Sequence, residues 1–202
     1  MNRYSISGSE GEHQPNSNAQ VLQNLLGITD LAEMNKVEAR LLKELYFYVF
    51  DHFPAELTSQ LLCKWHYIWL GNVYDWAGQY RTVDMSKPNI RFASPMQIPR
   101  LITDFEQVYL TRFNLLPSLS RAQQISYLAK AHVEFILLHP FREGNGRVAR
   151  LMLDVMAVKA GAQPLDYSLW DQYKEFYFRA IQAGLAEDYQ HIERLIFDVI
   201  EF

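Results

Sequence analysis

The sequence predicts an all-α fold with a single β-hairpin. Apolar side chains recur at helical spacing through most of the 202 residues. One stretch, residues 78–95, breaks that spacing with two short β-like runs around a turn. A chain of this length can bury one core and is short for two. We therefore expect one domain over residues 20–202, preceded by an arm over residues 1–19.

The arm is predicted from its composition. Residues 1–19 are rich in Ser, Gly and Asn and hold too few apolar side chains to offset the entropy lost on ordering, so we expect a flexible segment. The arm lacks the apolar stretch of a secretory signal, and no later stretch reaches the roughly 20 apolar residues of a membrane helix. We expect a cytoplasmic protein without membrane contact, and delivery through an unusual secretion signal stays open.

Two helices are expected before the hairpin. The first begins after Thr29 or Asp30, either of which can cap it, and it ends at Pro54. Its apolar residues share one face: Leu31, Met34, Val37, Leu41, Leu45 and Tyr48. The second helix is expected over residues 55–76, with its aromatic side chains in the core.

The hairpin is expected from two runs, residues 80–85 and 90–93, joined by a turn over residues 86–89 with the sequence Ser-Lys-Pro-Asn. Gly161 and Gly184 stand where the C-terminal caps of later helices are expected. The helices expected after the hairpin cover residues 96–113, 120–138, 145–161, 168–184 and 187–202.

The net charge and the cysteine content argue against some classes of function. The net charge is −4, from 19 basic and 23 acidic residues, and no basic run occurs. Affinity for a phosphate backbone requires clustered Lys and Arg, so direct nucleic-acid binding is not expected. The one cysteine, Cys63, has no partner for a disulfide or a paired-thiol metal site, and we interpret it as a structural thiol.

His139 is the first residue of a stretch, residues 139–150, that is rich in side chains able to take part in catalysis or binding. It continues the apolar stripe of the preceding helix at the point where Pro140 ends that helix. The residues of this stripe are Ile125, Leu128, Ala129, Phe135 and Ile136. The imidazole is therefore expected at the edge of the core.

The residues after Pro140 suit a polyphosphate. Gly144 and Gly146 allow backbone N–H groups to converge on an anion, and Asn145 or Gly146 opens a helix whose positive end favours phosphate. Arg147 and Arg150 lie on one face of that helix, where guanidinium groups can form paired hydrogen bonds with phosphates. Together these residues predict an anion site.

Glu143 adds a carboxylate beside the anion site. There it is better explained as a ligand of Mg²⁺ bound to phosphates than as a bare charge facing them. Taken singly, a histidine at a helix end is more often structural, and a Gly-Asn-Gly turn is commoner as a plain loop. Their combination within the 12 residues from 139 to 150 indicates polyphosphate chemistry.

This stretch resembles the Fic family motif, His-Pro-Phe-x-(Asp/Glu)-Gly-Asn-Gly-Arg-x-x-Arg, and matches every fixed position. Residues 25–30, residues 76–79 and the pair Asp188-Tyr189 resemble weaker landmarks of the family, so the resemblance covers about residues 20–200. It implies that residues 20–202 are a Fic domain, an all-α helical bundle with the hairpin as a flap over the active site.

The resemblance further implies a protein adenylyltransferase, which transfers AMP from ATP to a Tyr, Thr or Ser hydroxyl of a target protein and releases pyrophosphate. His139 is implied as the general base, Glu143 as the residue that positions Mg²⁺, and Arg150 as the partner of the γ-phosphate. The residues implied to bind the nucleotide are Gly144, Asn145, Gly146, Arg147 and Arg150.

Two further roles come from the resemblance. Phe141 is implied as the anchor that fixes the loop to the core. Ser86, Lys87 and Pro88 are implied as the flap tip, which holds the target segment by strand-like pairing. Lys87 either reaches the nucleotide or is an exposed turn lysine.

Regulation is inferred from a missing motif. Fic enzymes that transfer AMP are commonly restrained by a helix with the pattern (Ser/Thr)-x-x-x-Glu-(Gly/Asn), whose glutamate pairs with the second motif arginine, here Arg150. No stretch near either end fits this pattern. The chain therefore resembles the class inhibited by a separate small antitoxin, which makes it the toxin of a pair, and a degenerate inhibitory element within the arm is the alternative.

Other activities compete with AMP transfer as explanations of this motif. Transfer of UMP or of another phosphate-containing group stays open, whereas Gly146 departs from the Doc branch, so phosphate transfer is disfavoured. A catalytically inactive scaffold is disfavoured by the intact His139, Glu143 and motif arginines. His132 is interpreted as a core histidine, and Asp154 is expected to pair with Arg150 along the helix.

Overall fold

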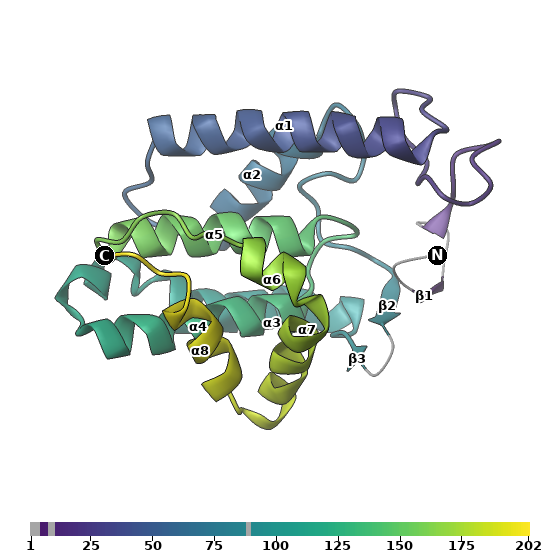
Figure 1. Cartoon of the computed structure of the whole chain (residues 1–202). Coiled ribbons are helices and arrows are strands. Elements are labelled where there is room, and N and C mark those ends of the chain that lie inside the picture. Colours follow the sequence, from purple (N-terminus) through teal and green to yellow (C-terminus); the bar gives the residue numbers. More distant parts are fainter. Residues whose placement is uncertain (1–4, 8–10, 88–89) are drawn as a thin grey trace.

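The computed structural model describes residues 5–7, 11–87 and 90–202, most of which are helical (Figure 1). The α-helices of this part of the chain are α1 (Leu31–Asp51), α2 (Ser59–Leu70), α3 (Ile98–Phe105), α4 (Arg121–Leu138), α5 (Asn145–Lys159), α6 (Ser168–Gln172), α7 (Lys174–Ala183) and α8 (Gln190–Phe197). The strands and shorter helical segments are β1 (Ser5–Ser7), β2 (Asp84–Lys87), β3 (Ile90–Arg91), the 3-10 helices η2 (Pro95–Gln97), η4 (Phe113–Ser118) and η5 (Gly184–Ala186), and the π-helical turn η3 (Glu106–Leu110). The all-α prediction is confirmed.

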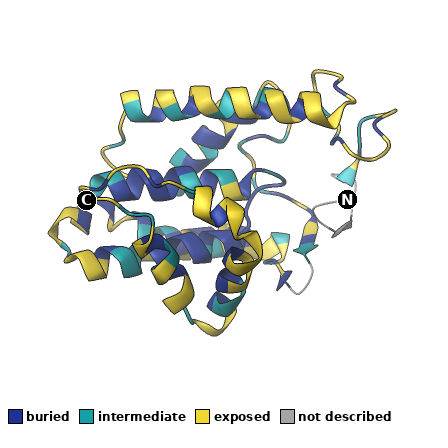
Figure 2. Cartoon of the chain, viewed as in Figure 1, coloured by how far each residue is buried: buried dark blue, intermediate teal, exposed yellow. Residues whose placement is uncertain are grey.

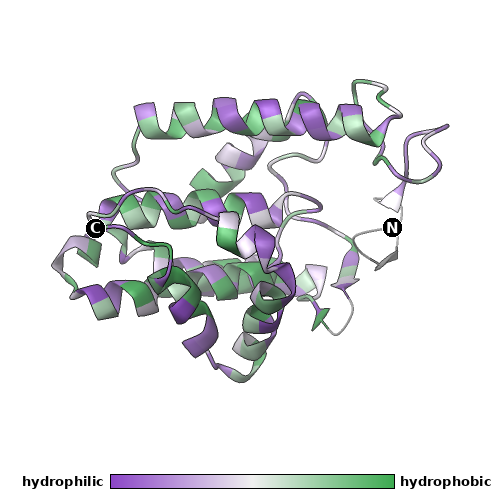
Figure 3. Ribbon diagram, in the orientation of Figure 1, coloured by the Kyte–Doolittle hydropathy of each residue, from purple (hydrophilic) through white to green (hydrophobic). Residues whose placement is uncertain are grey.

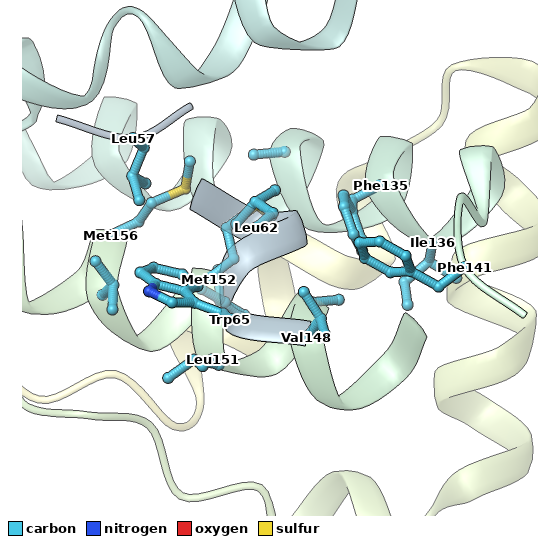
Figure 4. Packing of buried hydrophobic residues seen from close by; sticks show 14 of the residues in the cluster. Leu57, Leu62, Trp65, Phe135, Ile136, Phe141, Val148, Leu151, Met152 and Met156 are labelled. Carbon is cyan, nitrogen blue, oxygen red and sulfur yellow. The ribbon is translucent and has the colours of Figure 1, made fainter. Parts of the chain in front are cut away.

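Helix α5 lies at the centre of the molecule (Figure 2). Every residue from Val148 to Ala157 except Arg150 is buried, as expected for a helix that other elements cover on nearly all sides. Helices α4 and α2 both contact α5, and Figure 4 shows Leu62 and Trp65 of α2 beside the methionines of α5. The loop between α4 and α5 is therefore anchored to the core at both ends.

Helix α1 packs against α2 and begins where the sequence predicts. The Asp30 carboxylate accepts a hydrogen bond of 2.7 Å from the Glu33 N–H and so caps the helix. Hydrophilic and hydrophobic residues alternate along α1, as expected for a helix with one buried face (Figure 3). That face contains one acidic residue, Glu38, among the apolar ones.

The helices on either side of the predicted anion site also agree with the sequence. Ser120 caps α4, and its backbone N–H donates in return to the Gln123 side chain, so the two form a capping box. Helix α5 begins at Asn145, and Gly161 follows its end in the left-handed conformation, with φ of 93°. Gly184 is the C-cap of α7, as expected, and its φ of −61° is in the ordinary helical range.

Other predicted helices are shorter or divided. The helix expected over residues 55–76 is only α2, because the Thr58 hydroxyl caps its start at the Leu61 N–H. Residues 96–113 contain η2, α3 and η3 rather than one helix. The segment expected over 168–184 is divided into α6 and α7 at Tyr173, and the last predicted helix is α8 alone.

The hairpin is present with shifted strands. β2 and β3 pair antiparallel, with Ser86 opposite Arg91, so the expected runs over 80–85 and 90–93 are strands only in part. β1 adds a third strand on the other side of β2, with Ser5 opposite Ser86. Beneath the hairpin, a separate apolar cluster contacts Leu137 of α4; its members are Val83, Met85, Ile90 and Phe92.

The expected arm is described only in part, as β1 and residues 11–19. In these parts the arm makes specific contacts, whereas its composition predicted a flexible segment. The Gln14 N–H donates to the Val21 carbonyl at 2.9 Å, and Ser17 is buried. None of the described helices combines the length and apolar character that a membrane span requires.

Candidate active site

His139 ends α4 in a left-handed conformation, with φ of 53° and ψ of 60°. Its N–H still donates to the Phe135 carbonyl at 3.0 Å, and Pro140 then carries the chain out of the helix. A non-glycine residue rarely adopts this conformation. The imidazole is 2% exposed, at the junction of α4, the hairpin and the loop that leads to α5.

The His139 ring is fixed in one tautomer. Its Nδ1 lies 2.9 Å from the Ile136 carbonyl oxygen, which can only accept, so Nδ1 carries the proton and Nε2 carries the lone pair. The Phe92 ring stacks on the imidazole with 3.7 Å between centroids and 12° between planes. The pKa of His139 is lowered to about 3, chiefly by burial. The Ile136 hydrogen bond opposes this shift, and the charges of Lys87 and Arg81 add to it. His139 is therefore neutral at pH 7.

Arg81 connects the hairpin to His139. Its buried guanidinium donates to three backbone carbonyls: that of His139 at 2.8 Å from Nε, that of Val83 at 2.6 Å and that of Ala93 at 2.6 Å. The Arg81 backbone N–H donates to the Pro140 carbonyl at 2.9 Å. Both ends of the hairpin are thus joined to the residue at the end of α4.

The loop after Pro140 is closed by Asn145 and anchored by Phe141. The Asn145 carboxamide accepts from the Phe141 N–H at 2.8 Å and donates to the Phe141 carbonyl at 2.7 Å. The Phe141 ring is buried beside α4, as Figure 4 shows. The Asn145 side chain is therefore engaged within the loop, and only its backbone N–H remains in the position predicted for anion binding.

His66 of α2 supports the same loop from below. Its Nδ1 accepts from the Gly78 N–H at 2.7 Å, so Nε2 carries the proton and donates to the Glu143 carbonyl at 3.0 Å. Its ring stacks on Phe141, with 4.1 Å between centroids and 7° between planes. Burial lowers the pKa of His66 to about 4, which keeps the ring neutral.

The two motif glycines have different roles. Gly144 has φ of 83°, and a Cβ at this position would lie 2.6 Å from Trp69 Cζ3, so both conformation and space require glycine. Gly146 lies in the first turn of α5 with φ in the ordinary range, and a Cβ there would have no neighbour within 4 Å. The N–H groups of Asn145 and Gly146 belong to the helix turn whose donors have no acceptors within the helix.

A chain of charged groups runs from α1 to the loop. Arg147 donates from Nη2 to Glu143 Oε1 at 3.2 Å and from Nη1 to Glu38 Oε2 at 2.6 Å. The Arg147 guanidinium lies over the Trp69 ring, 4.3 Å from its centroid. The Gly144 N–H also donates to Glu143 Oε1, at 3.0 Å. The sequence predicted Arg147 as a phosphate ligand, and the structure places it between two carboxylates.

Arg150 faces α6. Its guanidinium forms two hydrogen bonds with the Asp171 carboxylate, at 2.8 and 3.2 Å, and lies over the Tyr167 ring, 4.7 Å from its centroid. Asp154 was expected to pair with Arg150; it instead accepts from the Tyr167 hydroxyl and from Tyr46. This prediction was wrong because Asp154 lies on the buried side of α5, where the two phenols reach it.

The flap residues are described in part. Ser86 and Lys87 lie in β2, whereas Pro88 lies outside the described residues. Lys87 Nζ lies 5.0 Å from the centroid of the Phe178 ring on α7, so this side chain spans from the hairpin to the helix that follows α6. Its charge also acts on His139, which places the lysine near the candidate base.

Sequence reasoning missed Arg81, His66, Glu38 and Asp171. Glu38 had a signal, because an acidic residue on the buried face of a helix requires a buried partner. His66 had a weaker one, as a polar ring within the apolar α2. The spacing of residues around Arg81 and Asp171 gives no signal that would distinguish them from ordinary surface residues. No group of three or more His, Cys, Asp or Glu side chains among the residues that the structure describes could bind a metal by itself.

The chain is similar in sequence to a known protein family and to several of its members. Residues 56–157 match the model of the Fic/DOC family. Protein adenylyltransferase VbhT of Bartonella schoenbuchensis is 35% identical over 159 residues, which are 75% of this chain and 32% of that protein. The probable protein adenylyltransferase Fic of Escherichia coli K12 is 29% identical over 133 residues, 64% of this chain and 62% of that protein. The chain thus spans less than two thirds of either relative.

Solved structures share the fold. The N-terminal FIC domain of Bep8 from Bartonella sp. 1-1C superposes with a TM-score of 0.77 at 24% identity, covering 89% of this chain and 90% of that one. BepC of Bartonella tribocorum, solved with bound AMPPNP, has a TM-score of 0.73 at 22% identity and covers 89% and 92%. At these identities the likeness establishes the architecture of α1 to α8 and the hairpin.

Proposed function

The chain belongs to the Fic/DOC family, and on this premise we propose that it is a protein adenylyltransferase. It transfers AMP from ATP to a Tyr, Thr or Ser hydroxyl of a target protein and releases pyrophosphate. One observation carries the proposal: a buried neutral histidine, its Nδ1 engaged by a carbonyl, stands at the start of a loop that leads directly into the N-terminus of α5. The names of the relatives support the same activity.

His139 acts as the general base. Its Nε2 takes the proton from the target hydroxyl as the hydroxyl oxygen bonds to the α-phosphorus, and the bond from that phosphorus to the pyrophosphate oxygen breaks. A low pKa keeps the imidazole neutral at pH 7 but makes it a weak base before the substrate binds. The negative charge of bound triphosphate raises the pKa of the imidazole, so the base strengthens when the substrate is present.

The first turn of α5 binds the phosphates. The N–H groups of Asn145 and Gly146 and the positive end of the helix stabilise their charge, and Gly144 permits the close turn that exposes these donors. Arg150 binds the γ-phosphate and so sets the direction of the ATP chain. Since Asp171 engages the same guanidinium, phosphate and carboxylate share this arginine.

The chemistry of Glu143 fits Mg²⁺. A Mg²⁺ ion in a nucleotide site takes one or two carboxylates and completes its ligands with phosphate oxygens and water. The Glu143 carboxylate is oriented by the Gly144 N–H and by Arg147, beside the helix end that receives the phosphates. When bound, the ion neutralises charge on the α- and β-phosphates. Phe141 and the Asn145 side chain fix the loop that presents Glu143.

The hairpin binds the target. Ser86 and Lys87, with Pro88, form the flap tip and align the target segment by strand-like pairing, so that its hydroxyl meets His139. The nearness of Lys87 to His139 supports this placement. A small antitoxin partner supplies an inhibitory glutamate to Arg150, which makes the chain the toxin of a pair. We place the protein in the cytoplasm, where ATP and the target occur.

Labelled nucleotides test the proposal. The purified chain is incubated with a bacterial lysate and ATP, GTP, UTP or CTP, each labelled on the α-phosphate, with His139→Ala as the control. Label from ATP should enter protein only with the unchanged chain. Label from UTP instead would assign UMP transfer, and no label from any of the four nucleotides would indicate an inactive scaffold. Label that persists with His139→Ala would contradict the role of His139 as the general base.

A further inference from the structure

Arg147 bridges two carboxylates that come from distant parts of the chain. Glu143 is four residues before it, and Glu38 is 109 residues before it, in α1. The two contacts use different guanidinium nitrogens, Nη1 for Glu38 and Nη2 for Glu143. The orientation of the Arg147 plane, together with the Gly144 N–H that donates to the same Oε1, therefore constrains the orientation of the Glu143 carboxylate.

Glu38 is itself fixed. Its side chain is 7% exposed, and the Tyr74 hydroxyl donates to Oε1 at 2.7 Å while Arg147 engages Oε2. Burial raises the pKa of the Tyr74 phenol, so the phenol remains a donor. A carboxylate at such a depth requires a cation, and Arg147 is the cation it contacts. The resulting ion pair is buried on the Glu38 side and only partly exposed on the Arg147 side.

Trp69 links the same residues a second time. Its indole N–H donates to the backbone carbonyl of Glu38 at 2.9 Å, its ring lies under the Arg147 guanidinium, and its edge limits the space at Gly144. The ring thus fixes the height of the guanidinium above α2. Arg147 is constrained by a carboxylate on each side and by an aromatic face below.

From these contacts we infer that Glu38 is a positioning residue which, through Arg147, orients Glu143 for Mg²⁺–ATP. This inference rests on the proposed function of Glu143. It assigns to Arg147 the orientation of a metal ligand, in place of the phosphate contact that its spacing predicted. Helix α1 thereby contributes to metal binding through the contact of Glu38 with Arg147.

Nucleotide binding measured with and without Mg²⁺ distinguishes two roles of Arg147, which are to orient the metal ligand Glu143 and to contact a phosphate directly. The probe is AMPPNP, and its dissociation constant is measured by calorimetry in EDTA and in excess Mg²⁺. Loss of a residue that supports a metal ligand costs about 10-fold or more in metal affinity. We expect Glu38→Gln and Arg147→Gln to remove most of the gain in affinity that Mg²⁺ gives, as Glu143→Gln does, and to leave the affinity in EDTA unchanged.

The matched control is Glu44→Gln, on the exposed side of α1. Within the part of the chain that the structure describes, Glu44 forms an exposed ion pair with Arg40 at 3.7 Å, so this variant should bind AMPPNP as the unchanged chain does. The unaltered affinity in EDTA shows that the Glu38 variant is folded. A full Mg²⁺ gain in Glu38→Gln would overturn the inference, as would an EDTA affinity that falls in Arg147→Gln alone. If the unchanged chain binds AMPPNP without any Mg²⁺ gain, the metal role of Glu143 in the proposed function fails.

Discussion

Nδ1 of His139 lies 2.9 Å from the carbonyl oxygen of Ile136, three residues earlier in the chain. The last turn of α4 thereby assigns the ring proton to Nδ1 and the lone pair to Nε2. With its pKa lowered to about 3 by burial, the ring requires no deprotonation before it accepts a proton at neutral pH. The geometry that supports a base also has consequences for the stability of the protein.

Stability should fall as the pH is lowered from about 6.5 towards 4. Burial lowers the pKa values of His66, His132 and His139 to about 4, 3 and 3, below the value of about 6.5 in an unfolded chain. The unfolded state therefore takes up more protons, and each such proton costs about 1.4 kcal/mol of unfolding free energy per pH unit. Asp154 opposes this, since burial raises its pKa to about 6, but it is one group against three.

Urea unfolding at a series of pH values between 7.5 and 4.5 measures this dependence. His66→Phe keeps the stacking on Phe141 and removes one titrating group, so its stability should decline less steeply with falling pH. The exposed His52 gives the control, because His52→Gln should show the slope of the unchanged chain. A stability that is flat across the range would mean that the three imidazoles are not buried in the neutral form.

Alanine at the two motif glycines should have opposite effects on stability. Gly144→Ala introduces a Cβ against the rigid Trp69 ring at a positive φ, and we expect a loss of about 1–3 kcal/mol. Gly146→Ala places a Cβ in open space within a helix, where alanine is favoured by up to about 1 kcal/mol. Thermal unfolding of the two variants checks the contrast, and similar melting temperatures would contradict it.

Asn145→Ala should open the loop. It removes both hydrogen bonds to the Phe141 backbone and leaves a buried N–H and a buried carbonyl without these partners, each costing about 1–3 kcal/mol. The exposed Asn114, in η4, provides the control, and Asn114→Ala should unfold as the unchanged chain does. Chemical unfolding compares the two, and equal free energies would show that Asn145 is not needed to close the loop.

Arg150→Ala should weaken the binding of ATP more than that of ADP, because only ATP has the γ-phosphate that this residue is proposed to bind. Asp171→Asn should strengthen ATP binding, since it removes the carboxylate that shares the guanidinium. The half-exposed pair contributes about 1 kcal/mol at most to folding, so the second variant remains folded. Calorimetric titration with both nucleotides decides; equal losses for ATP and ADP in Arg150→Ala would assign the arginine elsewhere.

The sequence predicted the long helices well and the short ones poorly. Helices α1, α4 and α5 have sustained periodicity and a residue that marks at least one end, such as Asp30 and Ser120. The break at Tyr173 between α6 and α7 has no glycine or proline to announce it. Strand β1 depends on pairing with β2 across a long separation in the chain, which local composition does not encode.

The candidate site also has a part that the sequence predicts and a part that it does not. The 139–150 loop could be predicted because its members are adjacent in the sequence, and their chemical roles stay predictions until the variants are made. The contacts that support the loop could not be predicted, since Glu38, His66 and Arg81 approach it only after folding. The side-chain partners of Asn145 and Arg147 depend on that folding too, so the sequence does not reveal them.

Arg81 attaches the hairpin to His139 through carbonyl oxygens, those of His139, Val83 and Ala93. Every amino acid supplies a carbonyl, so these attachments survive replacement of the side chains at the positions that provide them. The hairpin surface, which is proposed to bind the target, can therefore change in evolution while the hairpin keeps its place beside His139. Replacement of Arg81 itself would remove these hydrogen bonds, because they all come from its guanidinium.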